Sequence, residues 1–360
     1  MHSDSLVNLD SPEFVGDPET LYSQLRRRGD PVSCLCEGAA TVGFFSRASV
    51  IRLMRDRNFV ADEYPSAHLL GCPVGSSGYR QSASYKHLRR LLHDRLYLQD
   101  WRPRIGRIAA ELLAGRARGT TFCLAQDFAH PLMMRVTASL LDSDARTVGR
   151  WGEALSTLAD LGDAHAQRAR DVAVEVLAHV SERFASPGPD PLSICAALRQ
   201  RFGESDLVGT TQALLVVLAA GHGTTADMIV SAILGMENAK ALDLERSTEE
   251  ALRDCPSVQQ VFRRALEACE VEGASLAAGE SVMLSIASAN RDGDPAAAGH
   301  VSFGMGASYC IGAALARVAI QEALRALCVS VPTGELIRES IVWKSSSVLR
   351  GAHRALMTIR

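Results

Sequence analysis

The sequence lacks the features that mark several classes of protein. The 360 residues carry a net charge of −3, from 38 Lys and Arg against 41 Asp and Glu, and neither sign forms a block. Without a basic block nothing indicates nucleic-acid binding, and without an acidic run nothing indicates a solvating tail. The nine cysteines are scattered and form no C-x-x-C pair. Their pattern argues against a disulfide framework and against a zinc ribbon.

Long apolar runs are missing as well. The most apolar stretch, ALLVVLAAG at residues 213–221, is far shorter than the roughly 20 residues that a bilayer-spanning helix needs. The first segment, MHSDSLVNLDSPEF, carries acids and lacks the basic and apolar regions of a signal peptide. We therefore expect a soluble cytoplasmic protein with neither a membrane nor a nucleic-acid partner.

What the sequence does contain is helical periodicity. Hydrophobic residues make up 47% of the chain, which is enough for a large core. Apolar spacing and capping residues predict helices over residues 18–29, 49–56, 84–96, 101–119, 131–141, 169–184, 190–203 and 204–236, the last apolar on all sides and therefore central. Strand signals are few: a hairpin at 31–46 around Glu37 and Gly38, a strand at 280–292, and strands in the C-terminal tail. The prediction is a mainly α fold with small β sheets in one large domain.

The stretch FGMGASYCIG, residues 303–312, places one thiol behind a glycine-rich loop at the start of a helix. Glycine permits backbone conformations and close approaches that a Cβ would block. The N–H groups of a helix N-terminus favour the thiolate, which is the form that binds metals. No second cysteine or adjacent histidine completes a zinc site, so Cys310 suits an axial ligand to haem iron. The alternative is a structural cysteine buried in a glycine turn.

The pattern F-G-x-G-x-x-x-C-x-G-x-x-x-A resembles the haem-binding loop of the cytochrome P450 family. It is carried by Phe303, Gly304, Gly306, Cys310, Gly312 and Ala316. The resemblance implies a single P450-like domain over residues 1–360, with a central distal helix at about 204–236 and the haem-thiolate loop at 303–312. It also implies haem b, iron protoporphyrin IX, bound with the Cys310 thiolate as axial metal ligand.

A second stretch resembles the distal helix of that family. It reads Ala220-Gly221-His222-Gly223-Thr224-Thr225. The resemblance implies that Ala220 and Gly221 open a groove for dioxygen, and that the Thr224 hydroxyl bonds the oxygen and relays a proton. The alternative is that the threonines only bond back to preceding backbone carbonyls, as threonines inside helices do.

Further matches concern the support of the haem. Glu250-x-x-Arg253 resembles the family's Glu-x-x-Arg pair, which braces the cysteine loop, and i, i+3 spacing puts both side chains on one helical face. An arginine ahead of a strand, Arg263 or its neighbour Arg264, resembles a propionate ligand, for which a guanidinium is well shaped. Three residues are assigned to the propionates: Tyr85, Arg89 and Arg263.

The sequence departs from the family at several of these positions. Gly223 stands where an acid normally delivers protons, Ser308 replaces a propionate-binding His or Arg, and Tyr85 occupies the position of a histidine. The segments 161–167, 236–249 and 293–299 are short, which predicts a compact lid and a reshaped pocket.

The resemblance implies a haem-thiolate monooxygenase of bacterial secondary metabolism. It would hydroxylate, epoxidise or couple a small organic substrate, free or tethered to a carrier protein. It would be a monomer that receives electrons from a ferredoxin and a ferredoxin reductase. One alternative is a haem-thiolate enzyme that uses peroxide or catalyses a non-oxygenating rearrangement, because neither needs the missing acid. Another is a non-catalytic relative that assists a glycosyltransferase, which the short segments favour and the retained Cys310 does not.

Overall fold

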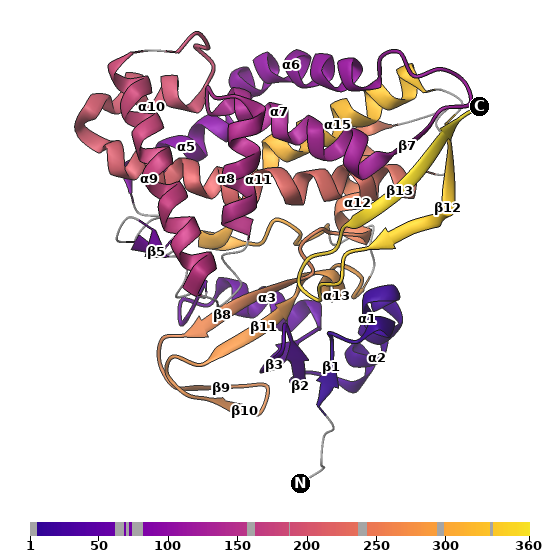
Figure 1. Ribbon diagram of the computed structural model, residues 1–360. Coiled ribbons are helices and arrows are strands. Elements are labelled where there is room, and N and C mark those ends of the chain that lie inside the picture. The colour runs from indigo at the N-terminus through magenta and orange to yellow at the C-terminus, as the bar shows by residue number, and fades with distance from the viewer. Residues whose placement is uncertain are drawn as a thin grey trace.

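The computed structural model describes residues 6–61, 68–69, 72–73, 82–156, 163–186, 188–236, 243–293, 299–331 and 334–360. Figure 1 shows a helical layer above a smaller part that holds most of the strands and the N-terminus. The helices are α1 (Pro12–Gly16), α2 (Pro18–Arg28), α3 (Arg47–Arg55), α5 (Ala83–His93), α6 (Arg95–Leu113), α7 (His130–Leu140), α8 (Ala145–Ser156), α9 (Asp163–Ala185), α10 (Ile194–Phe202), α11 (Leu207–Gly235), α12 (Leu244–Asp254), α13 (Ile286–Asn290) and α15 (Ala313–Ser330). A π-helical turn, Leu124–Ala129, precedes α7, and short 3₁₀ turns cover Gly203–Asp206 and Gly306–Ser308.

The strands form one larger sheet and several small ones. The six-stranded sheet has the order β1 (Val7–Asn8), β2 (Val32–Cys36), β3 (Ala39–Phe44), β11 (Ser281–Ser285), β8 (Gln260–Ala265), β4 (Phe59–Ala61). Near the C-terminus, β12 (Gly334–Trp343), β13 (Ala352–Ile359) and β7 (Thr121–Cys123) form a three-stranded antiparallel sheet. Two two-stranded pairs complete the set, β9 (Cys269–Val271) with β10 (Ala274–Leu276) and β5 (His68–Leu69) with β6 (Cys72–Pro73).

The helix α11 is the axis of the helical layer. It packs against α7, α8, α9, α12 and α15, and most of its side chains are buried. Asp206 caps its N-terminus by accepting the N–H of Gly209, so the helix begins at residue 207 rather than 204. By length and composition α11 could cross a membrane, but 56% of its apolar window is buried inside the structure. The predicted central helix is therefore confirmed.

The predicted hairpin is also confirmed, and its turn has a clear cause. Glu37 and Gly38 both adopt positive φ, +50° and +74°, as the two central residues of a tight hairpin turn require. The carboxylate of Asp10 accepts both of their N–H groups at 2.8 Å. This fixes the end of the β2–β3 pair against the N-terminal segment.

Several predicted boundaries were wrong, and two of them have a clear cause. The strand predicted over residues 280–292 ends at Ser285, because the Ser285 hydroxyl caps a helix, α13, that begins at the next residue. The helix predicted to start at residue 101 begins at Arg95, capped by Asp94, and contains Pro103 in its interior. The expectations about segments 161–167, 236–249 and 293–299 fall partly on residues outside the described ranges.

Candidate functional site

A cavity of about 330 Å³ lies between α11 and the glycine-rich loop before α15. Its lining is mostly apolar, with contributions from α5, α7, α11, β8 and the loop. The structure brings together seven of the residues singled out from the sequence: Ala220, Gly221, Thr224, Phe303, Gly304, Cys310 and Gly312 all line this cavity. Arg263 of β8 lines it too and is 5% exposed.

The loop that carries Cys310 has the backbone that its glycines predict. Gly304 and Gly306 have φ values of +69° and +63°, and a Cβ at Gly304 would lie 3.2 Å from the Ser308 carbonyl oxygen. The Cys310 N–H donates to the Phe303 carbonyl at 2.8 Å, which closes the loop on itself. Helix α15 begins three residues after Cys310, so the thiol lies at the mouth of that helix.

The electrostatics of Cys310 combine two opposing effects. Burial raises the pKa of the thiol, while the N–H groups of Gly312 and Ala313 and the charge of Arg317 act to lower it. The N–H groups at the helix N-terminus therefore act toward the thiolate, as expected from the sequence, but burial outweighs them. A cation at the sulfur reverses this balance, since metal coordination deprotonates a thiol.

The Thr224 side chain bonds back to its own helix. Its Oγ1 donates to the Ala220 carbonyl at 2.7 Å, which is the alternative considered from the sequence. The hydroxyl still lines the cavity. At Gly221 an added Cβ would touch only Val217 Cγ1, at 3.8 Å, and at Gly223 it would meet nothing within 4 Å among the described atoms. Gly221 and Gly223, which flank His222 in the sequence, therefore add no side-chain bulk to α11.

His222 itself turns away from this wall. Its Nδ1 lies 3.0 Å from the Leu218 carbonyl oxygen, and its ring packs against Gly152 of α8, where an added Cβ would come within 2.4 Å of His222 Cε1. Burial lowers the pKa of His222, so the ring is neutral at neutral pH. The glycine in α8 makes room for this placement.

Two of the proposed propionate ligands lie on α5. Tyr85 is buried and Arg89 is half-buried, one helical turn apart. Leu92, three residues beyond Arg89, lines the cavity. The structure thus brings α5 to the cavity, with Arg263 contributed separately from β8.

The predicted pair of Glu250 with Arg253 does not form. Glu250 accepts instead from Arg246 Nε at 2.8 Å, one turn earlier in α12, and Arg253 binds the carboxylate of Asp254 at 2.8 and 3.0 Å. Each side chain has an oppositely charged neighbour on the same helix that is within easier reach.

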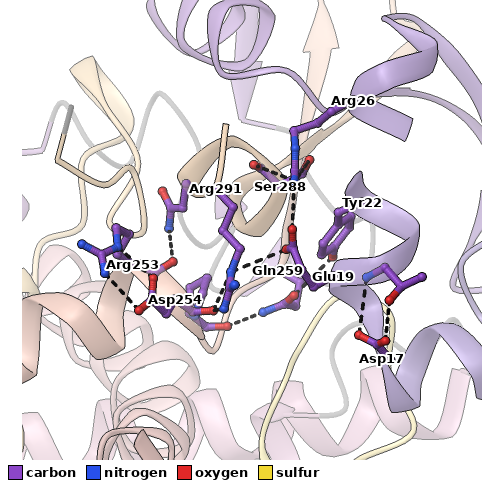
Figure 2. A network of polar contacts seen from close by, with 12 residues as sticks. Asp17, Glu19, Tyr22, Arg26, Arg253, Asp254, Gln259, Ser288 and Arg291 are labelled. Atoms are coloured by element: carbon purple, nitrogen blue, oxygen red, sulfur yellow. Dashed lines mark hydrogen bonds and ion pairs between the residues drawn. The ribbon is translucent and has the colours of Figure 1, made fainter. Parts of the chain in front are cut away.

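A polar network surrounds Arg253. Figure 2 shows it beside Asp254, whose carbonyl oxygen accepts from Arg291 Nη2 at 2.8 Å. Arg291 also approaches Glu19, which pairs with Arg26 at 2.7 Å. The network ties the end of α12 to α2 and α13.

The brace of the cysteine loop comes from residues that the motifs did not identify. Glu249 accepts from Arg317 Nε and Nη2 at 2.5 and 3.0 Å and lies 3.0 Å from His300 Nε2. The Arg317 guanidinium lies 4.6 Å from the ring centroid of Phe303, which begins the loop. Although burial opposes its ionisation, the hydrogen bonds and charges of His300 and Arg317 hold the pKa of Glu249 at about 2. The sequence hinted at this role of Glu249 only by placing it next to Glu250 of the Glu-x-x-Arg motif.

One buried nitrogen near Cys310 is without a partner. His93, the last residue of α5, has a buried Nε2 with no hydrogen-bond partner among the described residues. Its ring lies 6.0 Å from that of Tyr309, which precedes Cys310. A buried polar nitrogen of this kind calls for a hydrogen-bond partner from outside the chain.

Comparisons with known proteins agree on one family. No family model matches the chain. It is 30% identical over 286 residues to cytochrome P450 107B1 of Saccharopolyspora erythraea, covering 71% of this chain and 70% of the relative. It is 28% identical to 6-deoxyerythronolide B hydroxylase of the same organism, over 96% of this chain and 97% of the relative. Among solved structures, P450BioI in complex with a fatty-acid-ligated acyl carrier protein superposes with a TM-score of 0.80 at 21% identity, covering 97% and 99% of the two chains. At that identity the likeness is one of fold.

Proposed function

Because the chain belongs to the cytochrome P450 family and has its mainly α fold, we propose that it is a haem-thiolate monooxygenase acting on a small organic substrate. The observation that carries the proposal is that Cys310 and Thr224 line the same apolar cavity. The reaction would be a hydroxylation, an epoxidation or a coupling in bacterial secondary metabolism.

The residues at the cavity fit haem b with Cys310 as its axial ligand. The apolar lining suits a flat apolar macrocycle, and the glycine loop brings the thiol to it without side-chain bulk. Arg263 offers a buried guanidinium for a propionate, and the buried His93 Nε2 lacks a hydrogen-bond partner among the described residues. Tyr85 and Arg89 on α5 are the further proposed ligands. When bound, the haem supplies dioxygen activation, which its thiolate ligand promotes.

The side chains of α11 have distinct tasks in this proposal. Ala220 and Gly221 leave room beside the helix, and Thr224 holds a proton at Oγ1 on the cavity wall. Val216, Val217 and Met228 line the same cavity and would orient an apolar substrate while keeping water out.

The substrate and the electron donors are the finer part of the proposal. The relatives named above include 6-deoxyerythronolide B hydroxylase and a P450 in complex with a fatty-acid-ligated acyl carrier protein, which supports an apolar substrate, free or carrier-tethered. We propose that a ferredoxin with its reductase supplies electrons to a monomeric cytoplasmic enzyme.

The test is an absorption spectrum of the purified protein, ferric and then reduced under carbon monoxide. We expect a Soret band and a carbon monoxide complex with the red-shifted maximum of thiolate ligation. Cys310→Ser should lose that maximum, whereas Cys328→Ser, a change farther along α15, should keep it. A protein without a Soret band would contradict the proposal and support the auxiliary, non-catalytic reading.

A second candidate keeps the haem and changes the chemistry. At position 223 a glycine stands where an acid is expected, and the cavity lining that the structure describes contains no carboxyl group. This favours peroxide-driven oxidation or a non-oxygenating rearrangement. Product formation with peroxide alone, and none with ferredoxin and dioxygen, would select this candidate.

A further inference from the structure

The proposed reaction consumes protons inside the cavity. Insertion of one atom of dioxygen reduces the other to water with two electrons and two protons. Of the lining side chains that the structure describes, Arg263 and Cys310 ionise, and neither is a proton donor suited to neutral pH. The protons must therefore come from a group behind the lining, passed on through Thr224.

Asp227 is the buried acid closest along α11 to that threonine. It follows Thr224 by three residues and Gly223 by four, and side chains at these spacings are neighbours on a helix surface. The residue is 3% exposed. Burial raises the pKa of its carboxyl group, and the charge and hydrogen bonds of Lys344 oppose that rise. A carboxyl group in this setting takes up and releases protons closer to neutral pH than an exposed one.

The carboxylate is connected to the surface by basic side chains. Lys344, which follows β12, donates to both Asp227 oxygens at 2.8 and 2.7 Å, and His130 Nε2 of α7 lies 3.7 Å from Oδ1. The Lys344 and His130 side chains are 33% and 32% exposed, whereas that of Asp227 is 4% exposed. The cluster thus extends from solvent to the side of α11.

The other titratable groups around this cluster are histidines. Burial, with the charges of Lys344, His222 and His353, lowers the pKa of His130 to about 4. His222 of α11 also has a lowered pKa, because of burial and the charge of Lys344. Both rings are neutral at neutral pH, so Asp227 and Lys344 are the charged pair.

Gly223 leaves space next to both Thr224 and Asp227. An added Cβ there would meet no described atom within 4 Å. We propose, resting on the monooxygenase function above, that Asp227 is a positioning residue that supplies protons to Thr224 across this space. Lys344 Nζ passes a proton to the Asp227 carboxylate, and the resulting carboxyl group passes it to Thr224 Oγ1, which releases its own proton into the cavity. Solvent then reprotonates Lys344, so the net transfer is one proton from solvent to the cavity.

The test replaces the ion pair as a unit. Asp227→Asn alone leaves the Lys344 charge without a counterion, which can prevent folding, so the main variant is Asp227→Asn with Lys344→Met. The matched control is Glu322→Gln with Arg102→Met, which removes an ion pair between α15 and α6 whose carboxylate is likewise buried. The rescue variant adds Gly223→Glu to the main variant and restores an acid beside Thr224.

Two measurements are made on the haem-loaded proteins. The first is the C–O stretching frequency of the reduced carbon monoxide complex as a function of pH, which reports a titrating group near Thr224 without turnover. The second is the fraction of electrons released as hydrogen peroxide. In the main variant we expect the pH-dependent shift to vanish and product per electron pair to fall about tenfold or more, while haem content is unchanged. The control should match the wild type, and the rescue should recover both signals.

Two results would overturn the inference. One is a main variant with the wild-type pH dependence and coupling. The other is a loss of coupling that Gly223→Glu does not restore, since a purely structural role for Asp227 would give that pattern. Failure of every protein to bind haem would instead refute the proposed function, and the two failures are therefore distinguishable.

Discussion

At the residue scale, the proposed chemistry depends on the Thr224 hydroxyl, which is already hydrogen-bonded. Thr224 Oγ1 donates its proton to the Ala220 carbonyl, which leaves its lone pairs as acceptors toward the cavity. To hand its own proton to the cavity, the hydroxyl must accept a new proton and turn away from the Ala220 carbonyl. Thr225, the next residue on the helix, also lines the cavity and is 8% exposed.

Substitution of this residue separates the two candidate functions. In Thr224→Ala we expect product per electron pair to fall about tenfold or more under the monooxygenase function, with the lost electrons recovered as peroxide. Thr224→Ser keeps the hydroxyl and should retain most of the coupling. Stability should change little, because alanine is the better helix former. Unchanged coupling in Thr224→Ala would count for the peroxide or rearrangement chemistry.

The cysteine and threonine motifs were readable from sequence because spacing along one loop and one helix determines them. The bracing pair was not readable in this way. Glu249 and Glu250 are adjacent, and their different partners depend on where Arg317 and His300 lie in space. His93 carried no signal either, because nothing in the sequence shows which side of α5 approaches Tyr309.

At the element scale, α12 anchors the segment that leads into the cysteine loop. Glu249 binds Arg317 of α15 and His300, while the Ser302 hydroxyl donates to the Leu252 carbonyl at 2.5 Å. Asn290 of α13 donates to Ser302 Oγ at 2.7 Å and accepts the Val301 N–H at 2.8 Å. The segment before Phe303 is therefore fixed by two helices, and this defines the position of the loop.

The adjacent glutamates give a matched pair of variants. We expect Glu249→Gln to lower the free energy of unfolding by about 1–2 kcal/mol, because charge-assisted hydrogen bonds are lost at a half-buried site partly screened by solvent. Glu250→Gln should cost less than about 0.5 kcal/mol, since its Arg246 partner is exposed. Denaturant unfolding measures both. Equal losses of unfolding free energy in the two variants would show that Glu249 stabilises the protein no more than Glu250 does.

The same carboxylate predicts a response to acid. Its pKa is about 2 in the folded protein against an ordinary 4.5, so the folded state binds the proton less readily than the unfolded state does. The contribution of Glu249 is therefore complete above pH 4.5 and is lost as the pH falls toward 2. The stability difference between wild type and Glu249→Gln should shrink over that interval. A difference independent of pH would show that the ionised form is not what stabilises the loop.

At the scale of the whole molecule, the fold class followed from the sequence and several connections did not. Helical periodicity identified α11 and most other helices, because a buried apolar face has a period that local spacing reveals. The six-stranded sheet joins residues from three parts of the chain, Val7–Phe44, Phe59–Ala61 and Gln260–Ser285. The sequence of a short strand does not indicate which other strand it pairs with. The early start of α6 was missed because Pro103 reads as a boundary.

The cavity lies between the central helix α11 and the cysteine loop, which predicts a dependence of stability on the cofactor. A group that fills it in the folded state alone stabilises that state by mass action. We expect the haem-loaded protein to melt at a higher Tm than the haem-free protein, with Cys310→Ser showing a smaller gain. Calorimetry of both forms measures the difference. Identical melting of loaded and stripped protein would show that the cavity does not hold the haem.

The C-terminal sheet has a consequence for the interior. Lys344 follows β12 and Gly351 precedes β13, where an added Cβ would lie within 2.2 Å of Asp227. The segment that joins the two strands of the β12–β13 hairpin (Figure 1) therefore carries the Lys344 counter-charge that binds Asp227 of the central helix. A chain shortened before residue 344 would leave the buried Asp227 carboxylate without that counter-charge.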